Sequence, residues 1–413
     1  MRQINNIIST KIAGLFILVA FVLFSCVEDS KLKPTQTLPP PPLTDVHIEP
    51  TNGGAHITYT LPNVDDIAYV ICEYVYGGAT RRILSSVYKN FLTLEGFGDQ
   101  SEVEVCLKVA NRSHATSTPH IERFTPKEPA ILAILKSIKA EAAFGGINLT
   151  WDNPTRAVAG ILLYADDDEG EELVFRNLVF STEVNGIARM RGFSEQPRRF
   201  AFAVRDKYEN VSEMREVVLT PKYEAVLDKS LWREVGLAGD NTTTFNGRPL
   251  SFVWNNNWHD SWTTQIEGNP PMPQTVTIDL GLPVQLTRFV LWQRIDGDYR
   301  YTYSQFGFRY FDAWGTDVLR FPVNSTYYSD GQWKEDWVKL SLNGEELEII
   351  KPSGRTGLTD ITDEDRAAAV SGHEFDVSQD IRRVRYVRFE VREVWNKGQS
   401  MEMAEFNFYG DER

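Results

Sequence analysis

The stretch TVTIDLGLPVQLTRFVLWQR at residues 275–294 decides how the last third of the chain folds. In its first half, apolar Val276 and Ile278 alternate with polar neighbours, which is the period-two pattern of a strand with one buried face. Gly281 and Pro283 then interrupt the run, and a second apolar stretch follows. We therefore expect two strands joined by a tight turn.

A matching pattern lies near the C-terminus, in VRYVRFEVREVW at residues 384–395 and MAEFNFYG at residues 403–410. In the first of these, Val387, Phe389 and Val391 alternate with charged residues. This alternation predicts an antiparallel sheet that packs on one side only.

Taken in order, the D-L-G-x-P strand, the R-Y-V-R-F-E-V strand and the closing A-E-F-x-F-Y-G strand resemble the discoidin domain, also called the coagulation factor type C or galactose-binding-like domain. The resemblance covers about residues 227–410. It implies a jelly-roll sandwich of about eight strands, with ligands such as sugars or lipid head groups bound in loops at one end. An unrelated β-sandwich is the alternative.

The length of 413 residues suggests two to four domains, and an apolar content of 42% supports packed cores. The net charge of −14 argues against a nucleic-acid surface, which needs clustered Lys and Arg, and is compatible with neutral ligands such as sugars. The sequence contains no H-E-x-x-H, G-x-S-x-G, P-loop or G-x-G-x-x-G motif. We therefore expect a binding protein rather than an enzyme.

The N-terminus reads as a targeting segment. Residues 1–25 have a basic start and an apolar run that is too short to span a membrane comfortably, and they end in L-F-S before Cys26. This end resembles a bacterial lipobox, which implies lipidation of Cys26 and an outer-membrane anchor; an ordinary signal peptide is the alternative. The V-E-D-S that follows Leu-Phe-Ser-Cys resembles the surface-export signal of Bacteroidota lipoproteins, which implies that the protein faces the cell exterior. The rest of residues 26–42 is a Pro-rich, extended tether.

Two units of similar pattern follow the tether, at residues 43–129 and 130–225. The sequence GGAHITY at residues 53–59 matches GGINLTW at residues 145–151, and both units close on T-P-K. Short alternating strands separated by glycine turns indicate small β-sandwiches, and the repeat implies tandem modules. Both resemble immunoglobulin or fibronectin type III-like spacers, so the whole chain is expected to be all-β.

Three local features complete this interpretation. Cys72 and Cys106 fall on neighbouring strands, where a disulfide and two buried free thiols both fit. The acidic run at residues 166–172 favours a solvated hairpin turn over a cation site. A surface helix is expected at residues 362–370, where Thr362 and the aspartate three residues later form an acidic variant of the capping box.

The candidate ligand site lies in loops of the discoidin-like domain, residues 226–413. Trp258 and Trp262 are the expected platforms for a sugar, because aromatic surface supplies contact area at low entropy cost. Core packing is the alternative for each, and Trp254, which follows two apolar residues, is assigned to the core. The polar and aromatic partners expected around the platforms, which would hydrogen-bond to hydroxyls or widen the contact, are Asn257, His259, Asp260, Tyr299, Arg300, Tyr301, Trp395 and Asn396.

The resemblance also implies, as an alternative, a structural calcium ion in this domain. Sugar-binding discoidin domains often hold calcium through an early D-G-x-x-x-T-type loop and the glutamate of the closing motif. Glu405 matches the glutamate, whereas Asn255 stands where the aspartate is expected and Thr263 would supply the threonine. Asparagine and threonine oxygens do bind calcium, but the missing aspartate lowers the charge of the site. We therefore expect no required cofactor and keep calcium as an alternative.

The full order of lipobox, tether, two spacers and discoidin-like domain resembles lipoproteins of Bacteroidota encoded beside starch-utilisation-type uptake systems. This resemblance implies a cell-surface protein that captures polysaccharide and works beside outer-membrane glycan transporter components. The alternative is an adaptor lipoprotein whose last domain docks on a protein partner. A glycan hydrolase is the third and least favoured reading.

Overall fold

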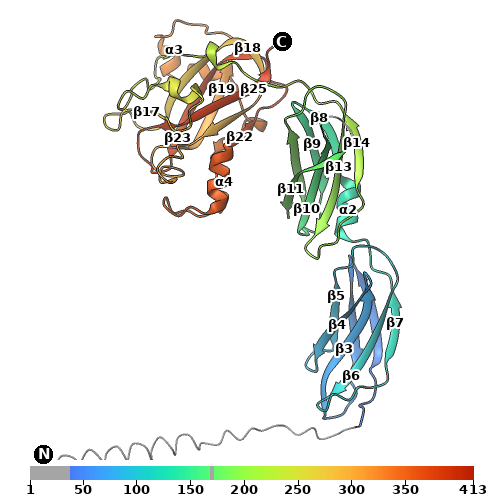
Figure 1. Ribbon diagram of the computed structural model, residues 1–413. Helices are drawn as coiled ribbons and strands as arrows, with labels where there is room; N and C mark the ends of the chain where they lie inside the picture. Colours follow the sequence, from blue (N-terminus) through green and yellow to red (C-terminus); the bar gives the residue numbers. More distant parts are fainter. Residues whose placement is uncertain (1–37, 168–171) are drawn as a thin grey trace, which may run out of the picture.

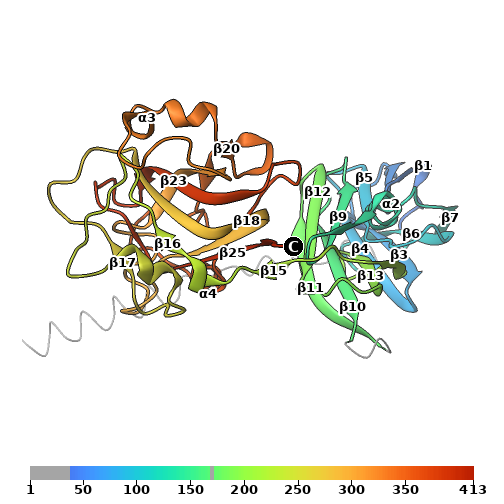
Figure 2. The same cartoon turned by 90° about the horizontal axis from the view of Figure 1, so that it is seen from above.

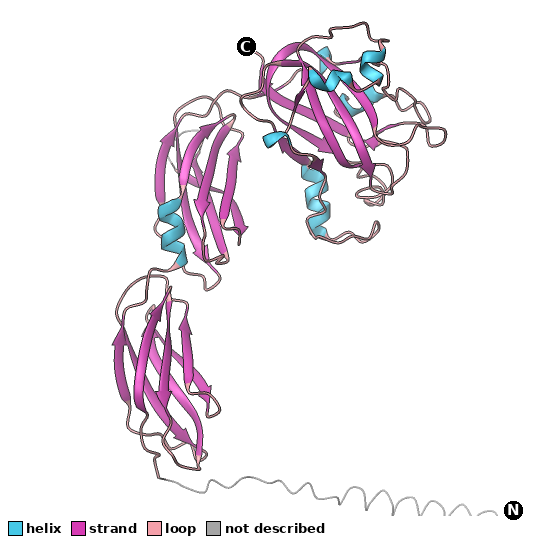
Figure 3. Cartoon of the chain, turned by 180° about the vertical axis from the view of Figure 1, so that it is seen from behind, coloured by secondary structure: helices cyan, strands magenta, loops and turns pink. Residues whose placement is uncertain are grey.

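The computed structural model describes residues 38–167 and 172–413, and the predicted all-β fold class is confirmed: three β-sandwiches follow one another along the chain (Figure 1). Short helices flank the β-sandwiches (Figure 3). Cys26, the signal segment and most of the tether lie outside the described residues. Over the described ranges, no helix is long and apolar enough to cross a membrane.

The first sandwich packs a three-stranded sheet, in the order β1-β2-β5, against a four-stranded sheet, in the order β4-β3-β6-β7. Its core forms because alternate residues such as Ile57, Val70 and Leu107 point inward and are almost fully buried. Cys72 on β3 is buried, Cys106 on β6 is half-buried, and both are free thiols. The strands are β1 (Thr44–Thr51), β2 (Gly54–Thr60), β3 (Ile67–Tyr76), β4 (Ala79–Ser86), β5 (Phe91–Glu95), β6 (Val103–Asn111) and β7 (His120–Phe124).

The second sandwich repeats this topology, with sheets in the orders β8-β9-β12 and β11-β10-β13-β14. Helix α2 (Ala130–Ser137), which the sequence analysis did not predict, buries Ile131, Ile134 and Leu135 against this core. Of the acidic run, residues 168–171 lie outside the described part of the chain. The strands are β8 (Lys139–Ala143), β9 (Gly146–Asp152), β10 (Ala159–Asp166), β11 (Leu173–Ser181), β12 (Asn185–Arg191), β13 (Arg198–Asp206) and β14 (Arg215–Leu219).

The C-terminal domain is built around β18 (Gln274–Trp292), a single strand of 19 residues. The expected pair of strands joined by a tight turn is therefore wrong. The first half of β18 pairs with β23 and the second half pairs with β25, so the strand bends from one sheet of the sandwich into the other. Gly281 lies at the bend with a φ of 89°, and a Cβ there would lie 2.7 Å from the Cβ of Leu231. The glycine and proline thus mark a bend at a close approach, not a hairpin.

The remaining strands extend these two sheets in the order β15-β25-β18-β23-β19-β20, with β16 and β22 also paired to β18 and β21 paired to β19. Strands β17 and β24 form a separate two-stranded sheet. The long strands of this set are β19 (Phe308–Thr316), β23 (Val384–Val394) and β25 (Glu405–Asp411). The short elements are β15 (Ala225–Val226), β16 (Arg233–Glu234), β17 (Trp262–Thr263), β20 (Val338–Lys339), β21 (Leu347–Glu348), β22 (His373–Asp376), β24 (Glu402–Met403), α3 (Thr326–Ser329), α4 (Asp363–Ser371) and the 3₁₀ turns η1 (Lys229–Leu231), η2 (Leu250–Trp254), η3 (Gln332–Glu335) and η4 (Leu342–Gly344).

Strand β23 shows that the sheet is covered on both sides. Val387, Phe389 and Val391 point into the main core, as their alternation predicted. However, Arg388 on the opposite face is also buried, beneath α3 and η3, where its guanidinium carbon lies 4.5 Å from the Trp333 ring centroid. The prediction of a sheet packed on one side only is therefore wrong, because an aromatic cluster covers the second face.

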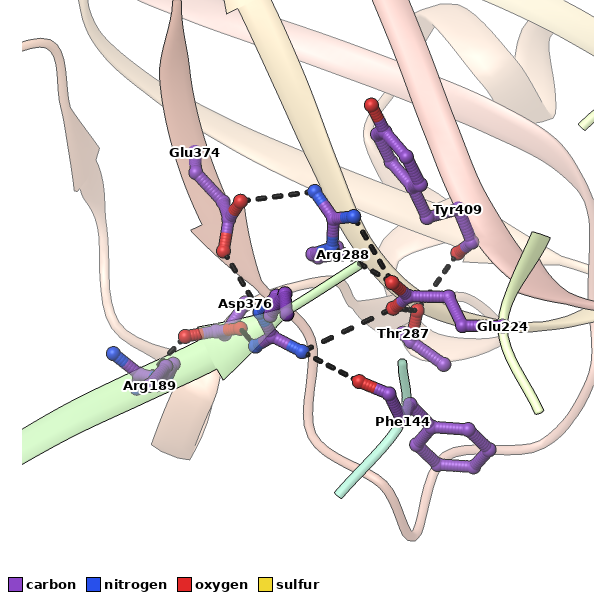
Figure 4. Close-up of polar contacts among 9 residues, drawn as sticks. Phe144, Arg189, Glu224, Thr287, Arg288, Glu374, Asp376 and Tyr409 are labelled. Carbon is purple, nitrogen blue, oxygen red and sulfur yellow. Dashed lines mark hydrogen bonds and ion pairs between the residues drawn. The ribbon is translucent and has the colours of Figure 1, made fainter. Parts of the chain in front are cut away.

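The C-terminal domain lies beside the second sandwich, and charged side chains hold the two together (Figures 2 and 4). Arg191 at the end of β12 forms ion pairs with Glu374 at 3.1 Å and with Asp376 on β22. Arg288 on β18 contacts Glu374 and Glu224, each at 2.9 Å. Because Glu224 sits in the connection between the domains, this network fixes the direction in which the C-terminal domain points.

Candidate functional site

A pocket of about 240 Å³ opens at one end of the jelly roll, where loops from distant parts of the sequence meet the short β17–β24 pair. The pocket combines aromatic walls with charged side chains, and small-molecule sites typically combine apolar walls with a few placed polar groups. Its lining residues are Phe245, Asn246, Arg248, Thr263, Ile266, Arg294, Tyr301, Gln305, Phe306 and Glu402.

Glu402 on β24 is the buried acceptor at the base of the pocket, with an exposed fraction of 3%. Its Oε1 atom accepts hydrogen bonds from Ser261 Oγ at 3.1 Å and Thr263 Oγ1 at 3.1 Å, and from Arg294 Nη1 at 3.2 Å. A buried carboxylate needs partners of this kind to offset the loss of hydration. The pairing of β17 with β24 supplies them, since it places Thr263 directly opposite Glu402.

Arg294 follows β18 and forms one wall of the pocket. Its guanidinium carbon lies 4.0 Å from the centroid of the Tyr301 ring, and Asp296 binds the guanidinium through Nε and Nη2. Burial alone would lower the pKa of Arg294, but the hydrogen bond to Asp296 and the charge of Glu402 raise it above its usual value. Arg294 is therefore a fixed cation that also positions an aromatic ring.

Arg248 has more freedom. Asn246 and Gly247, with φ values of 50° and 66°, form the turn that directs Arg248 into the pocket. Its Nη1 donates to Ser261 Oγ at 2.6 Å. Among the residues that the structure describes, no carboxylate lies within ion-pair distance of Arg248. A guanidinium carries five donors, so several remain for a ligand.

The aromatic loop that the sequence analysis favoured lies mainly outside this pocket. Trp258 is half-buried and packs edge-on against Trp292, with ring centroids 5.9 Å apart. His259 is exposed. Asp260 accepts hydrogen bonds from Asn257 Nδ2 at 2.9 Å and from Asn255 at 3.1 Å, so the polar side chains of the loop bond to one another.

Trp262, an expected platform, and Trp395, an expected partner of the platforms, are core residues, so the ligand-binding prediction is wrong for both and the core-packing alternative holds for Trp262. Trp262 has an exposed fraction of 1% and packs against Phe308. Trp395 has an exposed fraction of 6% and packs edge-on against Tyr303 at 5.4 Å. Both lie at core strands, where burying the indole ring is more favourable in free energy than leaving it exposed to water. Trp254 also packs against the core, at its edge, as expected.

Of the remaining expected residues, some lie at the pocket and others lie away from it. Tyr301 lines it. Arg300 is exposed, with its guanidinium carbon 4.8 Å from the Tyr301 ring centroid. Asn396 is exposed, and its backbone N–H donates to the carbonyl of the lining residue Gln305 at 2.8 Å. Tyr299 lies beneath Arg366, away from the lining.

Arg248, Arg294 and Glu402 were not predicted as site residues from the sequence. They are separated by up to 154 residues in the sequence, so only the topology brings them together. The sequence held one weak indication of these residues. Arg294 ends the stretch that decides the fold, and Glu402 comes just before the closing motif, so both are charged residues beside core strands. Charged residues at the ends of core strands deserve weight as site candidates.

The three residues proposed for calcium do not form a common site. Thr263 Oγ1 bonds to Glu402, and the side chain of Asn255 bonds to Asp260. Glu405 Oε1 accepts a hydrogen bond from the ammonium of Lys229 at 2.6 Å. Within residues 38–167 and 172–413, no group of three His, Cys, Asp or Glu side chains is placed to hold a metal ion. Because calcium needs six to eight converging oxygens, this arrangement does not fit it.

Three family models match consecutive parts of the chain, at residues 40–126, 127–230 and 253–410, and each is described as a domain of unknown function. No curated protein matches the chain. One matching solved structure is a SusE-like protein, with 29% identity over 68% of this chain and 99% of that protein, and a TM-score of 0.41.

Two further matches are carbohydrate-binding modules of family 32 from Clostridium perfringens. One belongs to a family 31 glycoside hydrolase, with 14% identity over 45% of this chain and 95% of the module, and a TM-score of 0.31. The other was solved with galactose, with 12% identity over 45% of this chain and 98% of the module, and a TM-score of 0.26.

Proposed function

We propose that the C-terminal domain binds carbohydrate in the pocket between Arg248, Arg294, Tyr301 and Glu402. The observation that carries this proposal is the combination of a half-exposed guanidinium with spare donors, a buried carboxylate and aromatic walls within one pocket of about 240 Å³. Sugar hydroxyls need planar donors and acceptors, and the C–H faces of a sugar need apolar surface.

The charges of the pocket favour a neutral sugar. The positive charges of Arg248 and Arg294 are matched by the negative charges of Glu402 and Asp296. Such a balanced site offers no net attraction to a carboxylate or sulfate group. We therefore expect neutral polysaccharides to bind more tightly than uronic acid-rich or sulfated ones.

The proposed setting is the cell surface. The lipobox-like end at Cys26 and the Pro-rich tether support a lipid anchor at the outer membrane, with the two spacer sandwiches carrying the binding domain outward. In this role the protein captures polysaccharide for neighbouring transporter components and performs no chemistry on it.

Affinity electrophoresis tests the proposal. The chain from residue 27 onward runs through gels that contain neutral, acidic or sulfated polysaccharides, beside Arg248→Ala and Arg355→Ala. Arg355 is an exposed arginine of the same domain that does not line the pocket, which makes it a matched control. Losing a charged hydrogen-bond donor should weaken binding roughly 10- to 100-fold.

Retardation by a neutral polysaccharide that is lost in Arg248→Ala and kept in Arg355→Ala is the expected result. Retardation that Arg248→Ala leaves intact would place the sugar elsewhere. No retardation by any polysaccharide would contradict the proposal and favour the adaptor, whose partner is a protein.

A further inference from the structure

A buried ion pair links η1, the turn that follows the first short strand of the C-terminal domain, to the start of its last strand, β25. Glu405 begins β25 and is fully buried. Lys229 lies in η1, just after the connection from the second sandwich, and its side chain has an exposed fraction of 10%. The Lys229 ammonium donates to Glu405 Oε1 at 2.6 Å and to Asn256 Oδ1 at 2.9 Å.

A capped turn fixes Lys229, and each charge of the pair shifts the pKa of the other. Asp228 caps η1 by accepting a hydrogen bond from the backbone N–H of Ser230 at 2.9 Å, which fixes the start of the Lys229 side chain. Burial lowers the pKa of Lys229, and its hydrogen bond to Glu405 opposes that shift. Burial raises the pKa of Glu405, and Lys229 opposes that shift in turn. Each charge thus depends on the other.

We propose that the Lys229 ammonium takes the place that a structural divalent cation would occupy beside Glu405, so that the domain folds without calcium. The ammonium supplies a positive charge and donates to two oxygens, Glu405 Oε1 and Asn256 Oδ1, that a calcium ion at this position would otherwise bind. A calcium ion at this position would have to displace the lysine, since two cations cannot share one buried carboxylate without strong repulsion.

The internal cation also positions a loop. Through Asn256, Lys229 ties the loop at residues 255–261 to the closing strand β25. The far end of this loop is Ser261, whose hydroxyl holds Arg248 in the pocket. Lys229 is therefore a positioning residue for the wall of the pocket. It occupies the position beside Glu405 that a structural calcium ion would take.

Calcium titration and thermal unfolding of the chain from residue 27 onward test the inference, and neither readout needs a sugar. For the wild-type protein we expect no calorimetric signal for Ca²⁺ binding, and the same unfolding temperature in 1 mM CaCl₂ and in EDTA. One Ca²⁺ bound per chain with a rise in the unfolding temperature would overturn the inference.

Variants separate the internal cation from a simple packing role. Lys229→Met keeps the aliphatic stem but leaves Glu405 buried without a counter-charge, so it should lower the unfolding temperature by roughly 5–15 °C. Adding Glu405→Gln removes the lone charge and should restore a large part of that loss. Lys397→Ala, at an exposed lysine of the same domain, is the control and should change nothing.

An unchanged unfolding temperature in Lys229→Met would contradict the role of the ammonium. An equal loss in the single and double variants would assign Lys229 to packing alone and would also contradict it. If Lys229→Met does not fold, the calcium titration of the wild-type protein decides by itself.

Discussion

Arg388 and Arg385 lie three residues apart on β23 and show how burial sets the cost of losing a charge. Arg388 and its partner Asp240 are each 1% exposed, and their N–O distance is 2.9 Å. Arg385 pairs with Asp279 at 2.7 Å, but its side chain is 37% exposed. Water screens the exposed pair, whereas a buried carboxylate that loses its partner keeps an uncompensated charge.

We therefore expect Arg388→Ala to lower the free energy of unfolding of the C-terminal domain by about 3–5 kcal/mol. The matched variant Arg385→Ala, with the same residue type on the same strand, should have a much smaller effect. Urea unfolding followed by tryptophan fluorescence measures both. Equal losses in the two variants would show that burial does not control the cost.

The buried His373 should make the stability of the C-terminal domain depend on pH. Its Nε2 is buried without a hydrogen-bond partner in the described structure, and burial lowers the pKa of the imidazole to about 4. An unfolded histidine has a pKa near 6.5. As the pH falls from about 6.5 to about 4, the unfolded chain therefore takes up a proton that the folded chain does not, and stability falls.

The expected loss over this window is about 1–3 kcal/mol, and His373→Gln should reduce it. Urea unfolding at pH 7.5, 6.0 and 4.5 measures the effect. His259→Gln, at an exposed histidine, is the control and should keep the wild-type pH dependence. If His373→Gln also keeps the wild-type dependence, the protonation of His373 does not cause it.

At the scale of single elements, α4 depends on its first residues. The expected capping box is confirmed: Thr362 accepts from the backbone N–H of Asp365, and Asp365 accepts from the backbone N–H of Thr362. Asp365 also accepts two hydrogen bonds from Ser353, from its backbone N–H at 2.9 Å and its hydroxyl at 2.7 Å. Burial raises the pKa of this carboxyl, but the hydrogen bonds outweigh burial and lower the pKa to about 2.

Asp365→Ala should therefore cost about 1–3 kcal/mol, because it removes the cap and leaves the donors of Ser353 unpaired. Asp363→Ala, in the same first turn, is the control, since the side chain of Asp363 is almost fully exposed. Urea unfolding measures both variants, with circular dichroism as a check on the helix. A loss in Asp363→Ala as large as that in Asp365→Ala would rule out the cap as the cause.

At this scale, features that depend on neighbouring residues in the sequence could be predicted, and features that depend on distant residues could not. Apolar alternation and the capping box are local patterns, and the structure places the alternate residues Val387, Phe389 and Val391 in one core and forms the cap. The bend in β18 looked like a turn because Gly281 and Pro283 suit either, and only the pairing with β23 and β25 separates the two. The pocket was missed because Arg248 and Glu402 meet only through the pairing of β17 with β24.

At the scale of the whole molecule, the joint between the second sandwich and the C-terminal domain is ionic. Arg191 links Glu374, Asp376 and the carbonyl of Phe144, so one side chain connects both domains at several points (Figure 4). Its side chain is only 16% exposed, which protects these contacts from solvent. We infer that the C-terminal domain is held in a fixed direction relative to the spacers.

Arg191→Ala should loosen this joint and increase the radius of gyration and the flexibility seen by small-angle X-ray scattering. The unfolding of the individual domains should change less, because Arg191 lies at the joint and not in a core. Arg156→Ala is the control, at an exposed arginine elsewhere on the second sandwich. Scattering curves that are identical for wild type and Arg191→Ala would contradict the fixed joint.

The central claim is that sugar binds in the pocket at the end of the jelly roll and not on the aromatic loop beside it. Isothermal titration calorimetry with an oligosaccharide of the retarding polysaccharide, comparing wild type with Arg248→Ala and Trp258→Ala, tests it most directly. Our account predicts that Arg248→Ala weakens binding roughly 10- to 100-fold, while Trp258→Ala, whose ring packs on Trp292 outside the pocket lining, has a small effect. Loss of binding in Trp258→Ala with wild-type affinity in Arg248→Ala would contradict it.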